Sequence, residues 1–288
     1  MNYIFHILIM VFIYGILSLS LNLLVGYGGL LSLSHSAFYG IGAYATTLLL
    51  IKGVNFFPAL IFSIFFTSIL SFFIAYPSLR LKGDYFVLAT LGFQIIVFSI
   101  LYNWVGLTKG PYGIPGIPRP KIFNFELSTP FHYFIFSGIF FFIVFLFFRK
   151  LYNSPYGRVL KSIREDEIAS ASLGKDIPLI KIWAFVISCG ICAISGSLYA
   201  TYVTYIDPTS FTLDESIFIM SIVILGGSGN LKGPFIGTCF MIILPEILRF
   251  LGLPDTIAPN VRQIIYGLLL IILMKYRPSG IMGEYSLQ

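Results

Sequence analysis

The chain has 288 residues, of which 57% are hydrophobic and only 10% are charged, with a formal net charge of +6. A soluble domain carries roughly 25% charged residues, so the composition excludes a soluble globular protein and predicts an all-α polytopic membrane protein. Because a span needs about 20 mostly apolar residues, the length leaves no room for a sizeable soluble domain. The positive charge fits Lys- and Arg-rich cytoplasmic loops and gives no reason to expect nucleic acid as a partner.

Residues 1–51 contain no Lys, Arg, Asp or Glu and predict two spans joined by a break at Gly26–His35. The first block, Tyr3–Leu24, lacks a preceding positive region and a small-residue cleavage site, so we expect a retained helix and not a signal peptide. Unwound backbone at membrane depth is tolerated only where it is buried in protein or lines a cavity. The break is therefore either a tight cytoplasmic turn or part of a pathway. Small residues that follow it predict close helix packing: Ala37, Gly40, Gly42 and Ala43.

The next three predicted spans are Phe57–Tyr76, Tyr85–Tyr102 and Phe131–Phe148, the last being almost pure Phe and Ile and expected to face lipid. Gln94 is the one strongly polar residue inside the second of them. Residues 104–130 form a predicted extracytoplasmic loop, because seven of the eleven residues at 110–120 are Gly or Pro.

Residues 149–181 hold seven Lys or Arg and are predicted to be a cytoplasmic loop. Ser154 followed by Pro155 predicts a helix start, and Ser162 with Glu165 predicts a second start through a capping box. Gly174 supplies a left-handed stop. The short helix expected from Ile163 to Leu173 would place Ile168, Ala169 and Leu173 on one face and Arg164, Glu165 and Asp166 on the other. Such a helix rests on the lipid surface or docks onto a partner; the alternative, which these features alone favour, is an ordinary basic loop.

The sixth predicted span runs from Ile182 to Tyr205, and an external turn follows at Ile206–Asp214. The next span ends in a second Gly-rich break, Gly226–Pro234, and the helix after it carries Glu246 and Arg249 at a spacing that allows them to pair. The last predicted span, Gln263–Met274, precedes Lys275 and Arg277 and indicates a cytoplasmic C-terminus. We expect about eight spans and an external N-terminus. Each Gly-rich break precedes a small-residue helix, which suggests an internal repeat of the kind found in transporters.

No arrangement typical of an enzyme is present. The three cysteines, Cys189, Cys192 and Cys239, lie in apolar blocks and are expected to pack, not to bind metal. There is no Walker A pattern, and the predicted span interiors hold no ionisable pair besides Glu246 and Arg249. Coupled carriers usually hold intramembrane carboxylates or ion-binding unwound helices. The residues therefore indicate a pore or permease that takes its energy from a partner protein.

Five stretches resemble the LivM-type permease subunits of bacterial branched-chain amino acid ABC importers, and the resemblance covers nearly the whole chain. The most specific is the charged loop segment SPYGRVLKSIREDEIA, Ser154–Ala169; the others are Gly26–Tyr44, Gly83–Leu91, Thr108–Ile114 and Leu225–Pro234. Lys109 and Ser34 stand where that family often has glycine, and the first of these leaves the form of the external loop open.

This resemblance implies a single permease domain over residues 1–288, located in the bacterial cytoplasmic membrane, which moves a branched-chain or related hydrophobic amino acid inward. Two cytoplasmic ABC ATPases would bind the ATP, so the chain itself needs no cofactor, metal or catalytic residue. A second, LivH-like permease subunit and an extracytoplasmic substrate-binding protein are the other implied partners. The coupling helix that grips the ATPase would consist of Arg164, Glu165, Asp166, Glu167, Ile168, Ala169, Leu173 and Gly174.

The Gly-rich breaks and a few polar residues are the expected lining of the translocation pathway: Gly28, Gly29, Ser32, Ser34, His35, Gln94, Gly226 and Gly227. Helix-end dipoles and backbone groups serve an amino acid zwitterion well, so no intramembrane counter-charge is required. Two alternatives remain at this stage. One is the same architecture used for urea or another small polar solute, and the other is a self-sufficient channel or secondary carrier.

Overall fold

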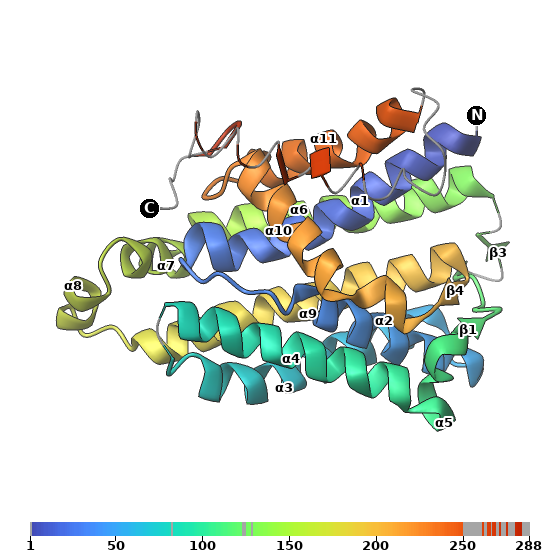
Figure 1. Cartoon of the computed structure of the whole chain (residues 1–288), viewed down its shortest axis with the longest axis horizontal. Helices are drawn as coiled ribbons and strands as arrows, with labels where there is room; N and C mark the ends of the chain where they lie inside the picture. Colours follow the sequence, from blue (N-terminus) through green and yellow to red (C-terminus); the bar gives the residue numbers. More distant parts are fainter. Residues whose placement is uncertain are drawn as a thin grey trace.

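The computed structural model of the chain describes residues 2–81, 83–122, 125–127 and 129–249, and beyond these only 261, 264–265, 267–268, 271, 275 and 280–283. It is a bundle of helices with two small antiparallel pairs of two-residue strands (Figure 1). The helices are α1 Asn2–Asn22, α2 His35–Ile51, α3 Phe56–Ser78, α4 Asp84–Asn103, α5 Val105–Thr108, α6 Pro130–Asn153, α7 Pro155–Glu165, α8 Glu167–Ser172, α9 Ile177–Val203, α10 Leu213–Gly226 and α11 Lys232–Arg249, with a π-helical turn η1, Leu23–Tyr27, and two 3₁₀ turns, η2 Gly110–Tyr112 and η3 Pro208–Phe211.

Five helices in the described part of the chain are long and apolar enough to cross a bilayer: α1 continued through η1, α3, α4, α6 and α9. Just over half of α1 and of α9 is buried, 56% in each case, whereas α3, α4 and α6 are 28% buried. α1 and α9 therefore lie in the core, together with the shorter α2, most of whose residues are buried. The outer three turn large apolar side chains outward, as expected for helices that contact lipid.

Glycines bring α2 and α9 into close contact, as the small-residue pattern after the first break predicts. A Cβ atom at Gly42 would collide with the backbone of Ala193, and one at Gly196 would collide with the carbonyl oxygen of Tyr39. Close approach of this kind compensates for the weak hydrophobic drive between helices in lipid, because it increases van der Waals contact.

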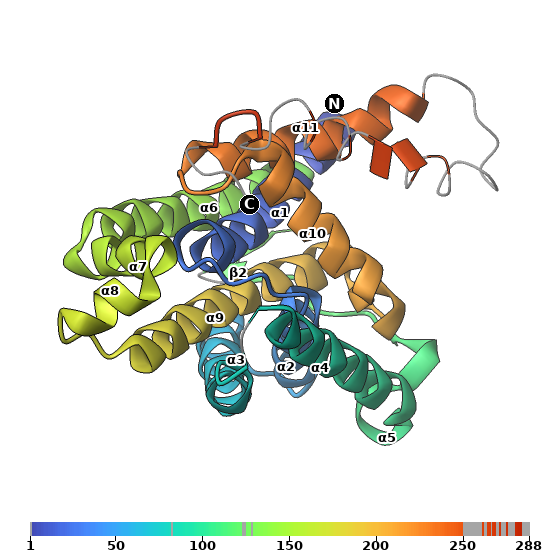
Figure 2. The same cartoon turned by 60° about the vertical axis from the view of Figure 1, so that its left-hand side comes forward.

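The segments that the sequence predicts to be extracytoplasmic lie together at one end of the bundle. The N-terminus and α5 lie there, and β1 (Ile114–Pro115) pairs antiparallel with β4 (Tyr205–Ile206), joining the Gly/Pro-rich loop to the second predicted external turn. The other pair, β2 (Lys121–Ile122) with β3 (Phe125–Glu126), is a hairpin. α7 and α8 lie at the opposite end (Figures 1 and 2). We call these the β1 end and the α8 end.

Both Gly-rich breaks interrupt the helices, as predicted. In the first, η1 ends at Tyr27, the backbone is non-helical over 28–34, and α2 begins at His35. In the second, α10 ends at Gly226 and α11 begins at Lys232.

The charged loop differs from its prediction in one respect. The expected single helix over 163–173 is broken, because Asp166 adopts an extended conformation between α7 and α8. The predicted capping box is wrong: Ser162 lies inside α7, where its hydroxyl donates to the Val159 carbonyl oxygen. The Asp166 carboxylate caps α8 instead by accepting from the Ala169 amide at 2.9 Å.

The other two signals in this loop are confirmed. Ser154 caps α7 by accepting a hydrogen bond from the Gly157 amide at 3.3 Å, with Pro155 at the first helical position. Gly174 has a φ of +74°, the left-handed conformation that ends the loop helices.

Two predictions involve residues outside those that the structure describes: the last span and the pairing of Glu246 with Arg249. The last predicted span, Gln263–Met274, falls largely outside the described residues, and so does the side chain of Arg249. Glu246 accepts a hydrogen bond from the Tyr3 hydroxyl.

The predicted number of spans conflicts with the predicted ends of the chain. An external N-terminus with a cytoplasmic C-terminus requires an odd number of membrane crossings, so a count of eight is incompatible with those two ends. The internal repeat stays a prediction.

Replacement of Gly196 by Ala tests the α2–α9 contact. The added methyl would push the two helices apart, and overpacking of this kind costs about 1–3 kcal/mol. We expect a lower free energy of unfolding, measured by SDS titration of the protein in micelles. Gly92→Ala is the matched control, since a Cβ at Gly92 in α4 meets nothing within 4 Å. An equal loss in both variants would contradict close packing at Gly196.

Candidate functional site

A buried asparagine joins the two Gly-rich breaks at the α8 end. The Oδ1 atom of Asn22 accepts from the Gly229 amide at 3.2 Å, and its Nδ2 atom donates to the Asn230 carbonyl oxygen at 2.8 Å. Gly26 lies against the Asn22 side chain and the Gly229 amide, and a Cβ atom at position 26 would collide with both. The two breaks, 200 residues apart in sequence, thus form one structural unit that the sequence did not reveal.

Beyond this junction the first break runs through the interior toward α2. The hydroxyl oxygens of Ser32 and Ser34 lie 2.9 Å apart, and both residues are fully buried. Thr90 on α4 accepts a hydrogen bond from the Leu33 amide at 3.1 Å. From Ser32 to Ser34 this non-helical backbone therefore lies within protein, which is the condition under which a bilayer tolerates it, whereas Gly29 and Leu31 are exposed.

His35 begins α2 and is fully buried. Its Nε2 atom lies 3.1 Å from the Ser188 hydroxyl, which itself donates to the Ser20 carbonyl oxygen at 2.5 Å. Because Ser188 uses its proton in that bond, His35 Nε2 must be the donor, and in the neutral ring Nδ1 is the acceptor. Nδ1 has no hydrogen-bond partner in the described structure.

Gln94 on α4 holds the start of α2. Its Oε1 atom accepts from the Ala37 amide at 2.6 Å and from the Ser216 hydroxyl at 3.3 Å, while its Nε2 atom donates to the Phe211 carbonyl oxygen at 2.9 Å. Ser216 in turn accepts from the Ser36 amide at 3.0 Å. Gln94 and Ser216 thus serve the amide groups that a helix N-terminus leaves without partners.

The predicted pathway residues therefore form two groups. Ser32, Ser34, His35 and Gln94 come together around the start of α2, whereas the four glycines lie toward the α8 end. Gly226 and Gly227 pack against residues 280–283, where the Met282 amide donates to the Gly226 carbonyl oxygen at 3.0 Å. That these eight residues line a pathway remains a prediction.

α7 is attached to the first break by basic side chains. The Arg164 guanidinium donates to the Gly26 carbonyl oxygen, and its aliphatic stem covers Gly29. Only 8% of the Arg164 side chain is exposed. One turn earlier, the Lys161 ammonium lies 5.0 Å from the centroid of the Tyr27 ring. Arg164, predicted to face a partner, instead faces the interior of this chain; Lys161 was not predicted to have a role.

α8 faces outward. Ile168 and Leu173 are 81% and 78% exposed, and Glu165, Asp166, Glu167 and Ala169 are also exposed. Glu167 pairs with Lys181 at 2.7 Å. Two large apolar side chains this exposed, beside carboxylates at a polar end of the molecule, are suited to a protein partner.

The base of the loop is fixed by Tyr156, whose hydroxyl donates to the Ile180 carbonyl oxygen at 2.8 Å and so joins α7 to α9. Burial raises the pKa of this hydroxyl, so it remains a protonated donor. Tyr27 stacks on Tyr152 of α6 at a centroid distance of 3.7 Å. α7 thus contacts α9 directly, and Lys161 of α7 lies over the Tyr27 ring that stacks on α6.

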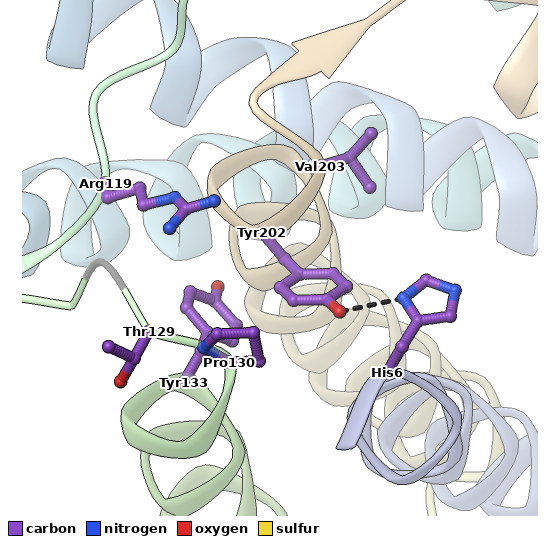
Figure 3. Close-up of a pocket in the computed structure, with 7 residues that line it drawn as sticks. All are labelled: His6, Arg119, Thr129, Pro130, Tyr133, Tyr202 and Val203. Atoms are coloured by element: carbon purple, nitrogen blue, oxygen red, sulfur yellow. Dashed lines mark hydrogen bonds between the residues drawn. The ribbon is translucent and has the colours of Figure 1, made fainter. Parts of the chain in front are cut away.

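A separate cavity of about 260 Å³ lies at the β1 end (Figure 3). His6 on α1 and Tyr202 on α9 line it and bond to each other, with 2.8 Å between His6 Nδ1 and the tyrosine hydroxyl, and Arg119 approaches from the Gly/Pro-rich loop. None of the predicted pathway residues lines this cavity, so it is distinct from the groups described above.

One carboxylate inside the bundle, that of Glu215, was not predicted to have a role. Glu215 lies in the first turn of α10, next to the predicted external turn, and was not counted among the ionisable groups inside spans. Its Oε1 atom accepts a hydrogen bond of 2.5 Å from the hydroxyl of Tyr14, near the middle of α1. The sequence signal was present, since Glu215 precedes a run, 216–225, that is apolar except for Ser216 and Ser221.

Replacement of Arg164 by Ala tests the attachment of α7 to the break. Loss of a charge-assisted hydrogen bond costs about 1.5–3 kcal/mol. We therefore expect amide hydrogen exchange over residues 23–30 to become faster by about tenfold or more. Arg158→Ala, which removes an exposed arginine from the same helix, should leave that exchange unchanged. Equal exchange in the two variants would argue against the attachment.

Replacement of Asn22 by Ala tests the junction of the two breaks. It leaves the buried Gly229 amide and Asn230 carbonyl without their partner, a loss of about 1–3 kcal/mol in the free energy of unfolding. The control is Asn103→Ala, which removes an exposed asparagine bonded only within its own helix, to Ser99. SDS titration in micelles measures both, and a junction of no structural importance would give two equal values.

The sequence matches the protein family described as "Branched-chain amino acid transport system / permease component" over residues 3–274. The chain is 34% identical to the high-affinity branched-chain amino acid transport system permease protein LivM of Salmonella typhimurium, over 95% of this chain and 68% of the relative. The LivM protein of Escherichia coli is also 34% identical, over 94% and 68%. The probable LivM of Methanocaldococcus jannaschii is 32% identical over 94% and 91%.

No solved structure matches the chain. The family match covers nearly all of it and agrees with the apolar helices and Gly-rich breaks described above. The chain is thus a multi-pass membrane protein and belongs to the family of permease components of branched-chain amino acid transport systems.

Proposed function

We propose that this chain is the permease subunit of an ATP-driven importer that moves a branched-chain amino acid across the bacterial cytoplasmic membrane. The names of its relatives supply the substrate class and support the main prediction from the sequence over urea, a channel or a secondary carrier. The observation that carries the energetic part is α8, which lies at the end of the bundle opposite the β1 end and exposes Ile168, with the exposed Leu173 directly after it.

The partners follow from this arrangement. An ABC ATPase, which binds the ATP, would take Ile168, Ala169 and Leu173 into a groove, with Glu165, Asp166 and Glu167 as polar contacts. The α8 end would then be cytoplasmic and the β1 end extracytoplasmic, where a substrate-binding protein delivers the amino acid. A second permease subunit of the LivH type would complete the membrane part.

A route from the ATPase to the pathway is supported by contacts within this chain. α8 follows directly from α7, and Arg164 of α7 binds the Gly26 carbonyl oxygen in the first break. Movement of the loop would therefore pull on the break and, through Asn22, on the second break. The solute would pass along the polar groups at the start of α2 and the glycines of the two breaks.

Replacement of Ile168 by Asp tests the ATPase surface. We expect the ATPases to be lost from the complex purified in mild detergent, with ATP-dependent leucine uptake reduced about tenfold or more, because a charge would enter an apolar contact. Tyr112→Asp is a matched control, since Tyr112 is equally exposed, at 81%, but lies at the β1 end. It should retain the ATPases. A complex that keeps its ATPases with Ile168→Asp would refute the proposed surface.

A further inference from the structure

Near the middle of the bundle, four helices bring polar groups together around Glu215. Tyr14 lies near the middle of α1, and Gln94 lies near the middle of α4. Glu215 bonds to the first, and its neighbour Ser216 bonds to the second. Ser216 also accepts from the Ser36 amide, which places the start of α2 beside the first turn of α10. The Glu215 carboxylate is therefore at mid-depth of the spanning helices, although α10 begins just after a turn at the β1 end.

A carboxylate at this depth is costly, because lipid and apolar side chains solvate charge poorly, and such residues usually mark a substrate or ion site. Among the described residues the ion pairs are Arg164 with Glu165 and Lys181 with Glu167. No described cation forms an ion pair with Glu215, whose one hydrogen bond, from Tyr14, engages Oε1. Among the described residues, the carboxylate therefore has no cationic partner.

Two buried hydroxyl groups beside the carboxylate also lack partners. Ser36 Oγ and Tyr39 Oη make no hydrogen bond in the described structure, although both residues are at most 1% exposed. They are three residues apart on α2 and so share one side of that helix. The Tyr39 ring packs against Phe211, whose carbonyl oxygen accepts from Gln94, the hydrogen-bond partner of Ser216. Buried polar atoms are normally hydrogen-bonded, so unsatisfied ones require an explanation, and a ligand would provide it.

Aromatic rings supply apolar surface next to these groups. Tyr14 packs edge-on against Phe218 at 5.6 Å between ring centroids, and Tyr39 packs edge-on against Phe211 at 5.1 Å. The region therefore offers a carboxylate, free hydroxyl groups and aromatic rings within one part of the bundle. An ammonium group carries three N–H donors, and an aliphatic side chain needs only apolar contact.

We infer that Glu215, with Tyr14, Ser36 and Tyr39, forms a mid-membrane binding site in which the carboxylate takes the α-ammonium group of the transported amino acid. The inference rests on the proposed function and adds to it an intramembrane counter-charge, which the sequence alone did not require. Tyr14 positions the carboxylate through its hydrogen bond. Tyr39 and Ser36 present hydroxyl oxygens to the remaining N–H donors of the substrate.

The test uses the complete importer, reconstituted in liposomes with its ATPases, second permease and binding protein. Glu215→Gln removes the charge but keeps a side-chain oxygen that can accept from Tyr14. Leucine uptake should fall about tenfold to a hundredfold, as expected for loss of a charge-assisted hydrogen bond. Assembly with the ATPases and the thermal stability of the complex should not fall, because a neutral amide is less costly than a carboxylate at this depth.

Two further variants separate the charge from the hydrogen bond. Tyr14→Phe removes the bond and keeps the carboxylate, so uptake should fall by less than in Glu215→Gln, and Glu215→Asp should restore part of the activity. Uptake equal to the unaltered importer in Glu215→Gln would overturn the inference, as would equal losses of uptake and stability in Glu215→Gln and Tyr14→Phe. If the unaltered importer takes up no amino acid, the proposed function itself fails, which is a different result.

Discussion

The hydrogen bonds of Asn22 are the interaction on which the arrangement of this permease depends. An amide side chain offers both an acceptor and donors, and at Asn22 these bind the Gly229 amide and the Asn230 carbonyl oxygen. Backbone groups without partners are costly inside a membrane protein, so a break in one helix becomes stable when another segment satisfies it. Here each break supports the other, and glycine at position 26 allows the approach. The result is one non-helical junction inside an otherwise helical bundle.

The junction of the two breaks lies next to α7 and α8. α7 turns a nearly buried arginine toward the break, and α8 turns two apolar side chains away from the bundle. The extended backbone at Asp166 separates the two short helices. α7 and α8 can therefore turn their side chains in different directions, although together they span only 18 residues. One continuous amphipathic helix would have presented a single stripe. The loop therefore has an inner attachment and an outer surface, a suitable form for a segment that transmits movement.

Deeper in the bundle, the start of α2 is held by side chains and not by a preceding turn of helix. Gln94 and Ser216 satisfy its first amides, which fixes α4 and α10 against α2. Such contacts make the position of Glu215 relative to Tyr39 depend on several helices at once. A shift of α10 against α2 would change the surroundings of the carboxylate. Binding of a solute at this level and movement of the helices would then be linked through the same hydrogen bonds.

The sequence by itself determined the features that depend on neighbouring residues. Hydrophobic blocks indicated membrane helices, Gly-rich runs indicated where helices stop, and Ser154 and Gly174 marked a helix start and a helix stop. These succeed because capping and left-handed backbone conformations are local. The tertiary structure alone decided that Arg164 faces inward, that Asp166 breaks the loop helix, that Asn22 joins the two breaks, and that Glu215 lies at mid-depth beside Tyr14. The physical reason is distance along the chain: partners such as Tyr14 and Glu215 are about 200 residues apart, and helical periodicity shows that a face is apolar but not which helix packs against it.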